Sequence, residues 1–235
     1  MYREGVFEDL GLRDYKETWD YQEELFSGLM DIKIKNRSLA STDKIKQINR
    51  LLFVEHPHVY TLGKSGSDNN LLLNHIQLQA RDASFYRINR GGDITYHGPG
   101  QIVGYPLLDL EEFNMTLKEY IYAIEEMIIK SLEEYGLTGI RIEGATGVWI
   151  AGKDQANPRK MCAIGVKASR YITMHGFAFN INTDLNYFNH INPCGFTDKG
   201  VTSVAEELGK RQDFEQAKRI VKNNFEKVFG ISWRS

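Results

Sequence analysis

Helical periodicity marks three stretches of the chain. Over residues 14–30, aromatic and aliphatic side chains recur every three or four positions, which predicts an amphipathic helix. A longer apolar stripe runs through residues 116–136, where Thr116 and Glu119 form a capping box and a glycine ends the pattern. The same spacing predicts a terminal helix over residues 214–229.

Short apolar runs between these helices predict strands. They cover residues 51–55, 84–89, 102–110, 139–143, 147–150, 160–168 and 171–181. Strands that cluster in the middle of a chain, with helices on either side, indicate an α+β fold with a mixed or antiparallel sheet. Residues 32–50 carry six lysines or arginines against one acid, and we interpret them as a solvated surface segment.

Composition narrows the class of protein. The chain has 235 residues and a formal net charge of −2, so no overall basic field favours nucleic acid. No apolar run reaches the ~18 residues of a membrane span, and the acidic start lacks the apolar core of a secretory signal. The two cysteines, Cys162 and Cys194, form no metal-binding or disulfide pattern. We therefore expect a reduced, cytoplasmic protein with no metal site.

The densest chemical signal is a glycine-rich segment, residues 90–101, called the glycine loop below. Its four glycines permit sharp turns and close approach of the backbone to a ligand. His97 lies inside the turn, and Arg90 and Gln101 flank it. The segment lacks the motifs of P-loops and of dinucleotide-binding turns. A tight connection between two strands is the alternative to a binding site.

Cys194 is a candidate nucleophile because it lies in a turn. Pro193 and Gly195 exclude it from the interior of a regular strand or helix. A thiol on an intracellular loop becomes a nucleophile when a neighbouring group lowers its pKa. Cys162 lies in an apolar run instead, which is typical of a buried cysteine.

Lys160 is a candidate for the group that activates the thiol. If residues 160–168 form a strand, Lys160 shares a face with Cys162, Ile164 and Val166. A partly desolvated lysine beside a thiol favours the thiolate and can carry a proton. A plain solvent-exposed lysine is the alternative. Other cationic or basic candidates are Lys167, Arg170, His97 and His175. His175 and Gln101 are further candidate site residues. His175 lies in an apolar strand, where a histidine is more often a core residue.

These motifs together resemble the lipoyl(octanoyl) transferases. The signature of that family is similar to residues 90–106, RGGDITYHGPGQIVGYP, and residues 52–63 resemble the segment before it. Residues 147–150, 159–167, 175–180 and 191–195 follow in the order of the family. The resemblance covers nearly the whole chain and rests on several independent motifs.

The resemblance implies a fold and an activity. The fold is α+β, shared with biotin and lipoate protein ligases, with a mixed sheet flanked by helices in one catalytic domain over residues 1–235. A large lobe is expected over about 1–182 and a smaller C-terminal lobe over about 183–235. The implied reaction moves an octanoyl group from octanoyl-acyl carrier protein to a lysine of a lipoyl domain, in lipoate biosynthesis. Acceptors would be 2-oxoacid dehydrogenase complexes and the glycine cleavage H protein, with no metal or other cofactor and no membrane or nucleic acid partner.

The resemblance also implies residue roles, position by position. Cys194 matches the nucleophile that forms an acyl thioester, and Lys160 matches the lysine that lowers its pKa. The positions that match acyl-binding segments are Arg90, Gly91, Gly92, Asp93, Ile94, Thr95, Tyr96, His97, Ala163, Ile164, Gly165, Gly176, Phe177 and Ala178.

Three other activities would fit parts of this pattern. An ATP-dependent lipoate–protein ligase on the same fold activates the free acid and needs no cysteine, so Cys194 in its turn argues against it. A thioesterase would release the acyl group to water. A non-catalytic acyl-binding module would have no activity to lose when the cysteine is replaced.

Overall fold

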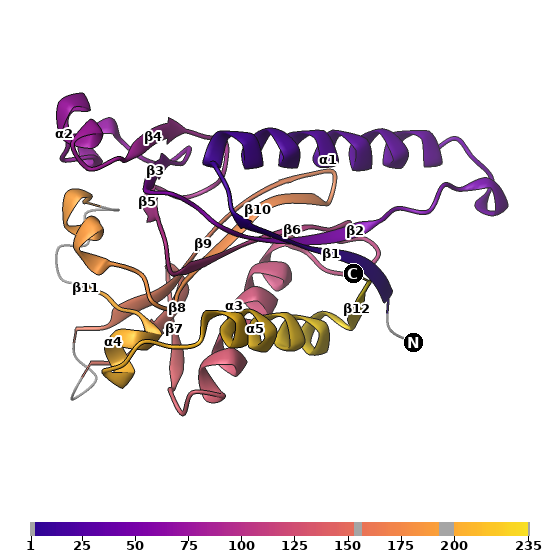
Figure 1. The fold of residues 1–235 in the computed structure, drawn as a ribbon. Coiled ribbons are helices and arrows are strands. Elements are labelled where there is room, and N and C mark those ends of the chain that lie inside the picture. The colour runs from indigo at the N-terminus through magenta and orange to yellow at the C-terminus, as the bar shows by residue number, and fades with distance from the viewer. Residues whose placement is uncertain (1–2, 153–156, 193–199, 235) are drawn as a thin grey trace.

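A mixed nine-stranded sheet forms the centre of the computed structural model, which describes residues 3–152, 157–192 and 200–234 (Figure 1). Its order is β12-β1-β2-β6-β10-β9-β8-β7, and β11 pairs with β9. The strands are β1 (Arg3–Leu12), β2 (Asn49–Glu55), β6 (Gln101–Leu107), β7 (Gly139–Ile142), β8 (Ala145–Ile150), β9 (Arg159–Ser169), β10 (Ile172–Asn180), β11 (Gly200–Val201) and β12 (Ile231–Arg234). Strand β1 is parallel to β2 and β12, and neighbours from β2 to β7 are antiparallel. The α+β prediction is confirmed.

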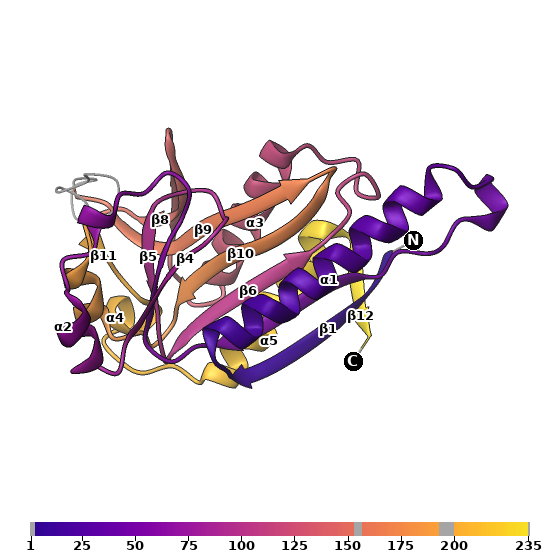
Figure 2. The same cartoon turned by 90° about the horizontal axis from the view of Figure 1, so that it is seen from above.

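Helices cover both faces of this sheet (Figures 1 and 2). They are α1 (Tyr15–Asn36), α2 (His75–Gln79), α3 (Leu117–Glu133), α4 (Val204–Leu208) and α5 (Phe214–Phe229), with short 3-10 turns η1 (Ser41–Asp43), η2 (Asp68–Asn70) and η4 (Leu185–His190). On β2, Leu52 and Val54 join the core under α1, whereas Leu51 and Phe53 join the core formed with α3 and α5. Alternate side chains thus enter opposite cores, so the run is apolar at every position.

A smaller sheet stands beside the first helix and carries the glycine loop. Its order is β4 (Ser84–Arg87), β3 (Val59–Leu62) and β5 (Ile94–His97). Tyr60, Leu62 and Tyr96 form its core, and Ile191, which follows η4, packs against them. The ring of Tyr187 in η4 stacks on His58 with ring centres 4.0 Å apart. The small sheet therefore fixes the glycine loop on one side and the chain before residue 193 on the other.

The predicted helices are present, but the first one is longer than expected. Asp14 caps α1, and the capping box of Thr116 and Glu119 opens α3. Helix α1 continues through residue 36, so the interpretation of residues 32–50 as a wholly solvated segment is wrong. Lys33 is buried, and its Nζ lies 2.6 Å from Asp109 and 2.9 Å from Glu111. Those carboxylates, distant in sequence, compensate the desolvated ammonium.

Five of the described strands were not predicted from the sequence: β1, β3, β5, β11 and β12. Strand β1 alternates poorly and carries acids, since it contributes few side chains to either core. Strand β12 pairs in parallel with β1, and α5 packs in the same core as α3. The proposed division into lobes at about residue 182 stays a prediction. None of the described helices is both long and apolar enough to cross a membrane.

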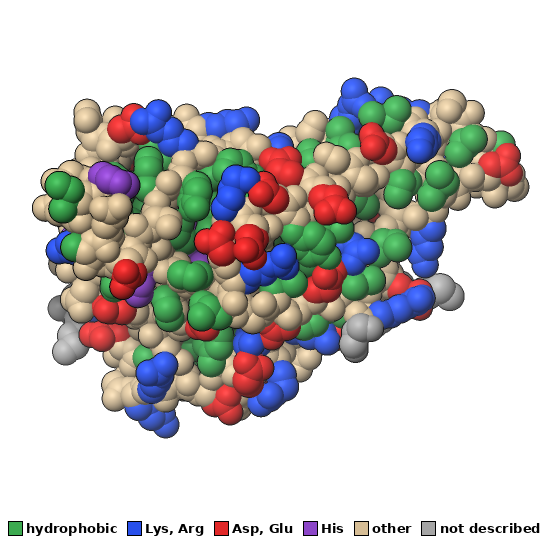
Figure 3. Space-filling view, turned by 45° about the horizontal axis from the view of Figure 1, so that its top comes forward, with side chains coloured by type: hydrophobic (Ala, Val, Ile, Leu, Met, Phe, Trp, Pro, Cys, Tyr) green, Lys and Arg blue, Asp and Glu red, His purple; other side chains and the backbone are tan. Residues whose placement is uncertain are grey.

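Acidic and basic side chains are interspersed on one face of the molecule. The face in Figure 3 shows blue and red groups beside one another, with apolar side chains between them. This mixture accords with the formal charge of −2. Surface ion pairs such as Lys16 with Asp20 on α1 contribute little to stability because water screens them.

Candidate active site

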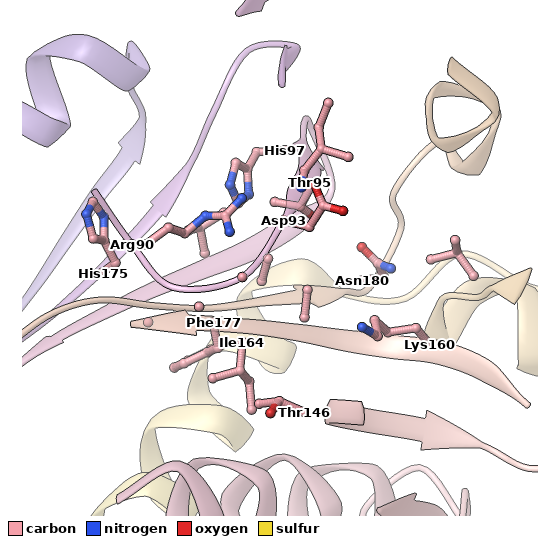
Figure 4. A pocket seen from close by; sticks show the side chains of 18 of the residues that line it. Arg90, Asp93, Thr95, His97, Thr146, Lys160, Ile164, His175, Phe177 and Asn180 are labelled. Carbon is pink, nitrogen blue, oxygen red and sulfur yellow. Dashed lines mark hydrogen bonds between the residues drawn. The ribbon is translucent and has the colours of Figure 1, made fainter. Parts of the chain in front are cut away.

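A cavity of about 390 Å³ lies between the glycine loop and strands β9 and β10; we call it the site cavity (Figure 4). Most sequence-predicted site residues line it, although they come from three separate segments. They are Arg90, Gly92, Asp93, Ile94, Thr95, His97, Gln101, Lys160, Ala163, Ile164, Gly165, His175, Gly176, Phe177 and Ala178. Gly91 and Tyr96 do not line it. Gly91 instead donates its N–H to Val166, and Tyr96 packs in the core of the small sheet.

Small residues of two paired strands form the floor of the site cavity. Gly165 pairs with Gly176, and Ala163 pairs with Ala178. A Cβ atom at residue 165 would lie 2.9 Å from Cδ of Arg90 and 2.9 Å from the carbonyl oxygen of Gly91. The glycine loop can therefore rest on the sheet because residue 165 has no side chain.

Lys160 lines the site cavity and is the second residue of β9. Its Nζ lies 4.5 Å from the centre of the Trp149 ring, a cation–π contact with a buried indole. Figure 4 shows Lys160 on the opposite side of β9 from Ile164. The pairing of β8 with β9 shifts by one residue between these positions, with Val148 opposite Cys162 and Trp149 opposite Lys160.

This β-bulge overturns one prediction. Lys160 does not share a face with Cys162 and Ile164, because the extra residue breaks the two-residue alternation. Cys162 is fully buried in the core that α3 and α5 form, and burial raises the pKa of its thiol. Cys162 is therefore an inert thiol, as its apolar sequence context indicated.

Buried polar groups form the wall opposite the floor. Arg90 donates to the carbonyl oxygen of Thr61 at 2.8 Å and to its hydroxyl at 3.0 Å. Nδ1 of His97 lies 2.9 Å from Oε1 of Gln101, whose Nε2 donates to Asn180. Because the amide oxygen can only accept, His97 carries its proton on Nδ1. Burial, together with His56 and Arg90, lowers the pKa of His97 to about 3, so the ring is neutral at pH 7.

Two more histidines lie near this wall. His175 lines the site cavity with a left-handed backbone, φ 60°, and its Nε2 lies 2.8 Å from Oδ1 of Asn89. Burial and the charge of Arg90 lower its pKa to about 3. Burial likewise lowers the pKa of His56 to about 4, while its Nε2 lies 2.9 Å from the Tyr105 hydroxyl. The cluster is thus uncharged apart from its arginine.

Asp93 ties the glycine loop to the turn before α2. Its carboxylate accepts from Nδ2 of Asn70 at 2.8 and 2.9 Å and from the N–H of Ile94 at 2.6 Å. Among the described residues no group of His, Cys, Asp and Glu is arranged to hold a metal ion. We therefore assign Asp93 to holding the loop.

Cys194 lies outside the described residues, and so do Pro193 and Gly195. The chain on either side reaches the site cavity. Ile191 lines it, and the N–H of Asn192 donates to Asn70 at 2.8 Å. On the far side Gly200 and Val201 line it as well and pair with β9 at Arg159 and Lys160.

Several lining residues were missed in the sequence. Tyr15, Trp149 and Asn180 each line the site cavity. Tyr15 begins a helix and Asn180 ends a strand, so each was assigned to an element and to no site. The asparagine in the segment HGFAFN was the one available signal, since a polar residue closing a wholly buried strand calls for a partner.

Comparison with known proteins identifies the class. The model of the lipoyl protein ligase A/B catalytic domain matches residues 14–226. Solved lipoate ligases share the fold: the bipartite lipoate protein ligase of Thermoplasma acidophilum aligns with a TM-score of 0.71 at 15% identity, covering 100% of this chain and 87% of that one. A lipoate-protein ligase A bound with ATP aligns with a TM-score of 0.67 at 15% identity, over 99% and 88% of the two chains. The chain belongs to the lipoyl protein ligase A/B catalytic domain family.

Within that family the chain is similar to transferases. An octanoyltransferase of Flavobacterium johnsoniae is 58% identical over 225 residues, which cover 95% of this chain and 96% of the relative. An octanoyltransferase of Parabacteroides distasonis is 55% identical over 223 residues, which cover 95% and 97%. The chain is thus an acyltransferase of the octanoyltransferase type, which acts in lipoate biosynthesis. This confirms the predicted family and class of enzyme.

Proposed function

We propose that this enzyme takes an octanoyl group from octanoyl-acyl carrier protein and transfers it to a lysine of a lipoyl domain through a thioester on Cys194. One observation carries the proposal. Lys160 lines a cavity with a floor of small residues, and the chain just before and just after the Cys194 segment also lines that cavity. The acceptors would be the lipoyl domains of 2-oxoacid dehydrogenase complexes and the glycine cleavage H protein, in the cytoplasm.

The first half-reaction is an exchange of thioesters. Lys160 takes the proton of the Cys194 thiol, and the thiolate attacks the carbonyl carbon of the octanoyl thioester. The C–S bond to the carrier breaks, and the departing pantetheine thiolate receives the proton back from Lys160. Because one thioester replaces another, the step is nearly isoenergetic and calls for no ATP.

The second half-reaction forms the amide. The neutral amine of the acceptor lysine attacks the acyl-cysteine, and Lys160, now an uncharged amine, removes its extra proton. The C–S bond to Cys194 then breaks, which leaves a thiolate beside an ammonium. An amide is more stable than a thioester, so this step draws the sequence forward.

The floor and wall of the site cavity suit an acyl chain of limited length. Each buried methylene contributes ~0.8 kcal/mol. Ala163, Gly165 and Ala178 leave room for the chain along the sheet, and the Arg90–Thr61 pair bounds that room at the wall. Neutral His97 lines the same space without adding a charge.

The decisive experiment is intact-mass measurement after mixing the enzyme with octanoyl-acyl carrier protein. We expect one octanoyl increment on the wild type, none on Cys194→Ala, and an unchanged increment on Cys162→Ala. An increment that persists in Cys194→Ala would show that Cys194 is not the residue that carries the octanoyl group.

Adding a lipoyl domain separates the rival activities. Loss of the increment with gain of an octanoyl amide on the domain supports transfer. Release of free octanoate at the same rate with or without the domain would indicate a thioesterase. Turnover with octanoate and ATP in place of the carrier would indicate a ligase.

A further inference from the structure

A series of buried hydrogen bonds begins at the wall of the site cavity. Arg90 has donors only, so the Thr61 hydroxyl accepts a hydrogen bond from it at 3.0 Å. The same hydroxyl can then donate its proton to Nε2 of His97, which lies 3.4 Å away. His97 in turn donates from Nδ1 to Gln101 at 2.9 Å. All four side chains are buried. Each therefore donates toward the next, in one direction.

The series continues in the same direction to strand β9. Nε2 of Gln101 donates to Oδ1 of Asn180 at 2.9 Å, and Nδ2 of Asn180 donates to the carbonyl oxygen of Thr202 at 3.0 Å. The backbone N–H of Thr202 then donates to the carbonyl oxygen of Lys160 at 3.0 Å. Asn180 is thus the last side chain in the series before the backbone of Lys160.

Asn180 is well placed to control that backbone. It is 3% exposed and lines the site cavity, and Figure 4 shows it on the same side of the sheet as Lys160. The oxygen and the nitrogen of its side-chain amide are both hydrogen-bonded to other residues of the enzyme. Asn180 is therefore placed to hold those residues in position. Its partner Thr202 directly follows β11, which pairs with β9 at Arg159 and Lys160.

We infer that Asn180 is a positioning residue, which holds Thr202 and β11 against β9 and so fixes the place of the Lys160 amine in the site cavity. The inference rests on the proposed role of Lys160. A flexible lysine side chain depends on a fixed backbone to keep its amine within reach of a thiol, because proton transfer falls off steeply with distance.

Replacement of Asn180 by aspartate tests this directly. An ionised carboxylate cannot donate to the Thr202 carbonyl oxygen, whereas a protonated one restores both hydrogen bonds with the same shape. Burial and a facing carbonyl oxygen favour the protonated form as the pH falls. The measured quantity is the rate at which octanoyl-acyl carrier protein octanoylates the enzyme, expressed as the ratio of Asn180→Asp to wild type. This ratio should therefore be low at pH 8 and rise about tenfold by pH 6.

Asn182 offers a matched control on the same chain segment. Its Nδ2 donates to the carbonyl oxygen of Gln212 and its Oδ1 accepts from the N–H of the same residue, so both ends of its amide are hydrogen-bonded, as they are in Asn180. It does not line the site cavity. Asn182→Asp should leave the ratio to wild type level between pH 6 and pH 8. The ionisable side chains near Asn180, namely those of His97, Lys160 and Glu207, are the same in the wild type and in both variants, so the ratio removes the contribution that they share.

A second measurement distinguishes this inference from the proposed function. In a Cys162→Ala background, the rate of alkylation against pH reports the Cys194 thiol. Lys160→Ala should move the profile to higher pH, and Asn180→Asp should move it in the same direction by a smaller amount. If Lys160→Ala moves it and Asn180→Asp does not, the positioning role is wrong and the proposed function stands.

The remaining outcomes are equally decisive. If Lys160→Ala leaves the profile unchanged, the proposed role of Lys160 fails, and the inference fails with it. A low Asn180→Asp rate with no recovery at pH 6 would mean general structural damage and would overturn the inference. Should Asn180→Asp fail to fold, Gln101→Glu tests the preceding bond with the same logic, because its protonated acid again donates to Asn180.

Discussion

The floor and the wall of the site cavity are built by opposite means. The floor consists of small residues on paired strands, such as Gly165 and Ala178, and it offers room. The wall consists of large polar groups, Arg90, His97 and Gln101, that are buried and bonded to one another. A floor of this kind constrains the shape of a ligand, whereas the wall constrains orientation and charge. Lys160 lines the same cavity.

The largest effect should follow from removing the amine of Lys160. Lys160→Met keeps much of the side-chain volume and eliminates the charge and the proton carrier. We expect octanoylation of the enzyme to slow by about 10²- to 10⁴-fold, the usual range for a general acid–base group. Single-turnover kinetics with octanoyl-acyl carrier protein measure it.

Lys167→Met provides the control for that experiment. Lys167 is on the same strand, but its ammonium binds Glu23 of α1 at 3.2 Å. Its replacement should leave the octanoylation rate within about twofold, as is usual for a partly exposed pair away from the site. Equal losses in the two variants would mean that the effect is not specific to the amine of Lys160, and its assigned role would be wrong.

A smaller effect is expected from filling the floor. Gly165→Ala places a methyl group 2.9 Å from Arg90 and from the Gly91 carbonyl oxygen, so the glycine loop must move. We expect kcat/KM for the octanoyl donor to fall about tenfold, mainly through KM, because relieving an overpacked contact, at a typical cost of about 1–3 kcal/mol, displaces the loop that lines the cavity. Gly28→Ala in α1, where a Cβ meets nothing within 4 Å, serves as the control and should leave kcat/KM unchanged. An unaltered KM in Gly165→Ala would show that the floor does not contact the acyl chain.

The buried His97 of the wall should affect how the free energy of unfolding depends on pH. His97 has a pKa of about 3 when folded and an ordinary value near 6.5 when unfolded. Below pH 6.5 the unfolded chain therefore binds a proton that the native state does not, and the free energy of unfolding falls. The contribution of His97 is complete above pH 6.5 and is lost as the pH drops toward 3, at about 1.4 kcal/mol per pH unit.

Urea unfolding between pH 7 and pH 5 measures this slope. His97→Gln removes one titrating group and should reduce the slope by about one proton. His75→Gln in the short helix α2, where the side chain is exposed, should leave the slope as it is. A slope in His97→Gln equal to that of the wild type would mean that His97 is protonated in the folded enzyme.

Part of the fold could be predicted from the sequence. Local patterns were enough for the main helices, most strands and the glycine loop, because spacing and capping are encoded by neighbours such as Thr116 and Glu119. They were not enough for β1, whose pairing with β2 and β12 depends on residues far along the chain. The bulge that turns Lys160 away from Cys162 likewise depends on the facing strand β8.

Candidate site residues were predictable where a motif concentrated them. Arg90, His97 and Gln101 stand in one segment, and the structure brings them to the same cavity as Lys160. The hydrogen-bond partners of Thr61 and Asn180 were not predictable, because each residue lies in an apolar strand and its partner lies on a different element. The role of Cys194 stays a prediction, because that residue lies outside the described ranges.

Because of the cation–π contact between Lys160 and Trp149, the fluorescence of Trp149 can report on the state of the lysine. Indole fluorescence responds to a charge held over the ring, so neutralisation or displacement of the amine at 4.5 Å changes the emission. The chain has three tryptophans, and replacing Trp19 and Trp233 by phenylalanine would leave a single emitter beside the amine. Each turnover could then be followed in real time without attaching a dye to the enzyme or to either protein it meets.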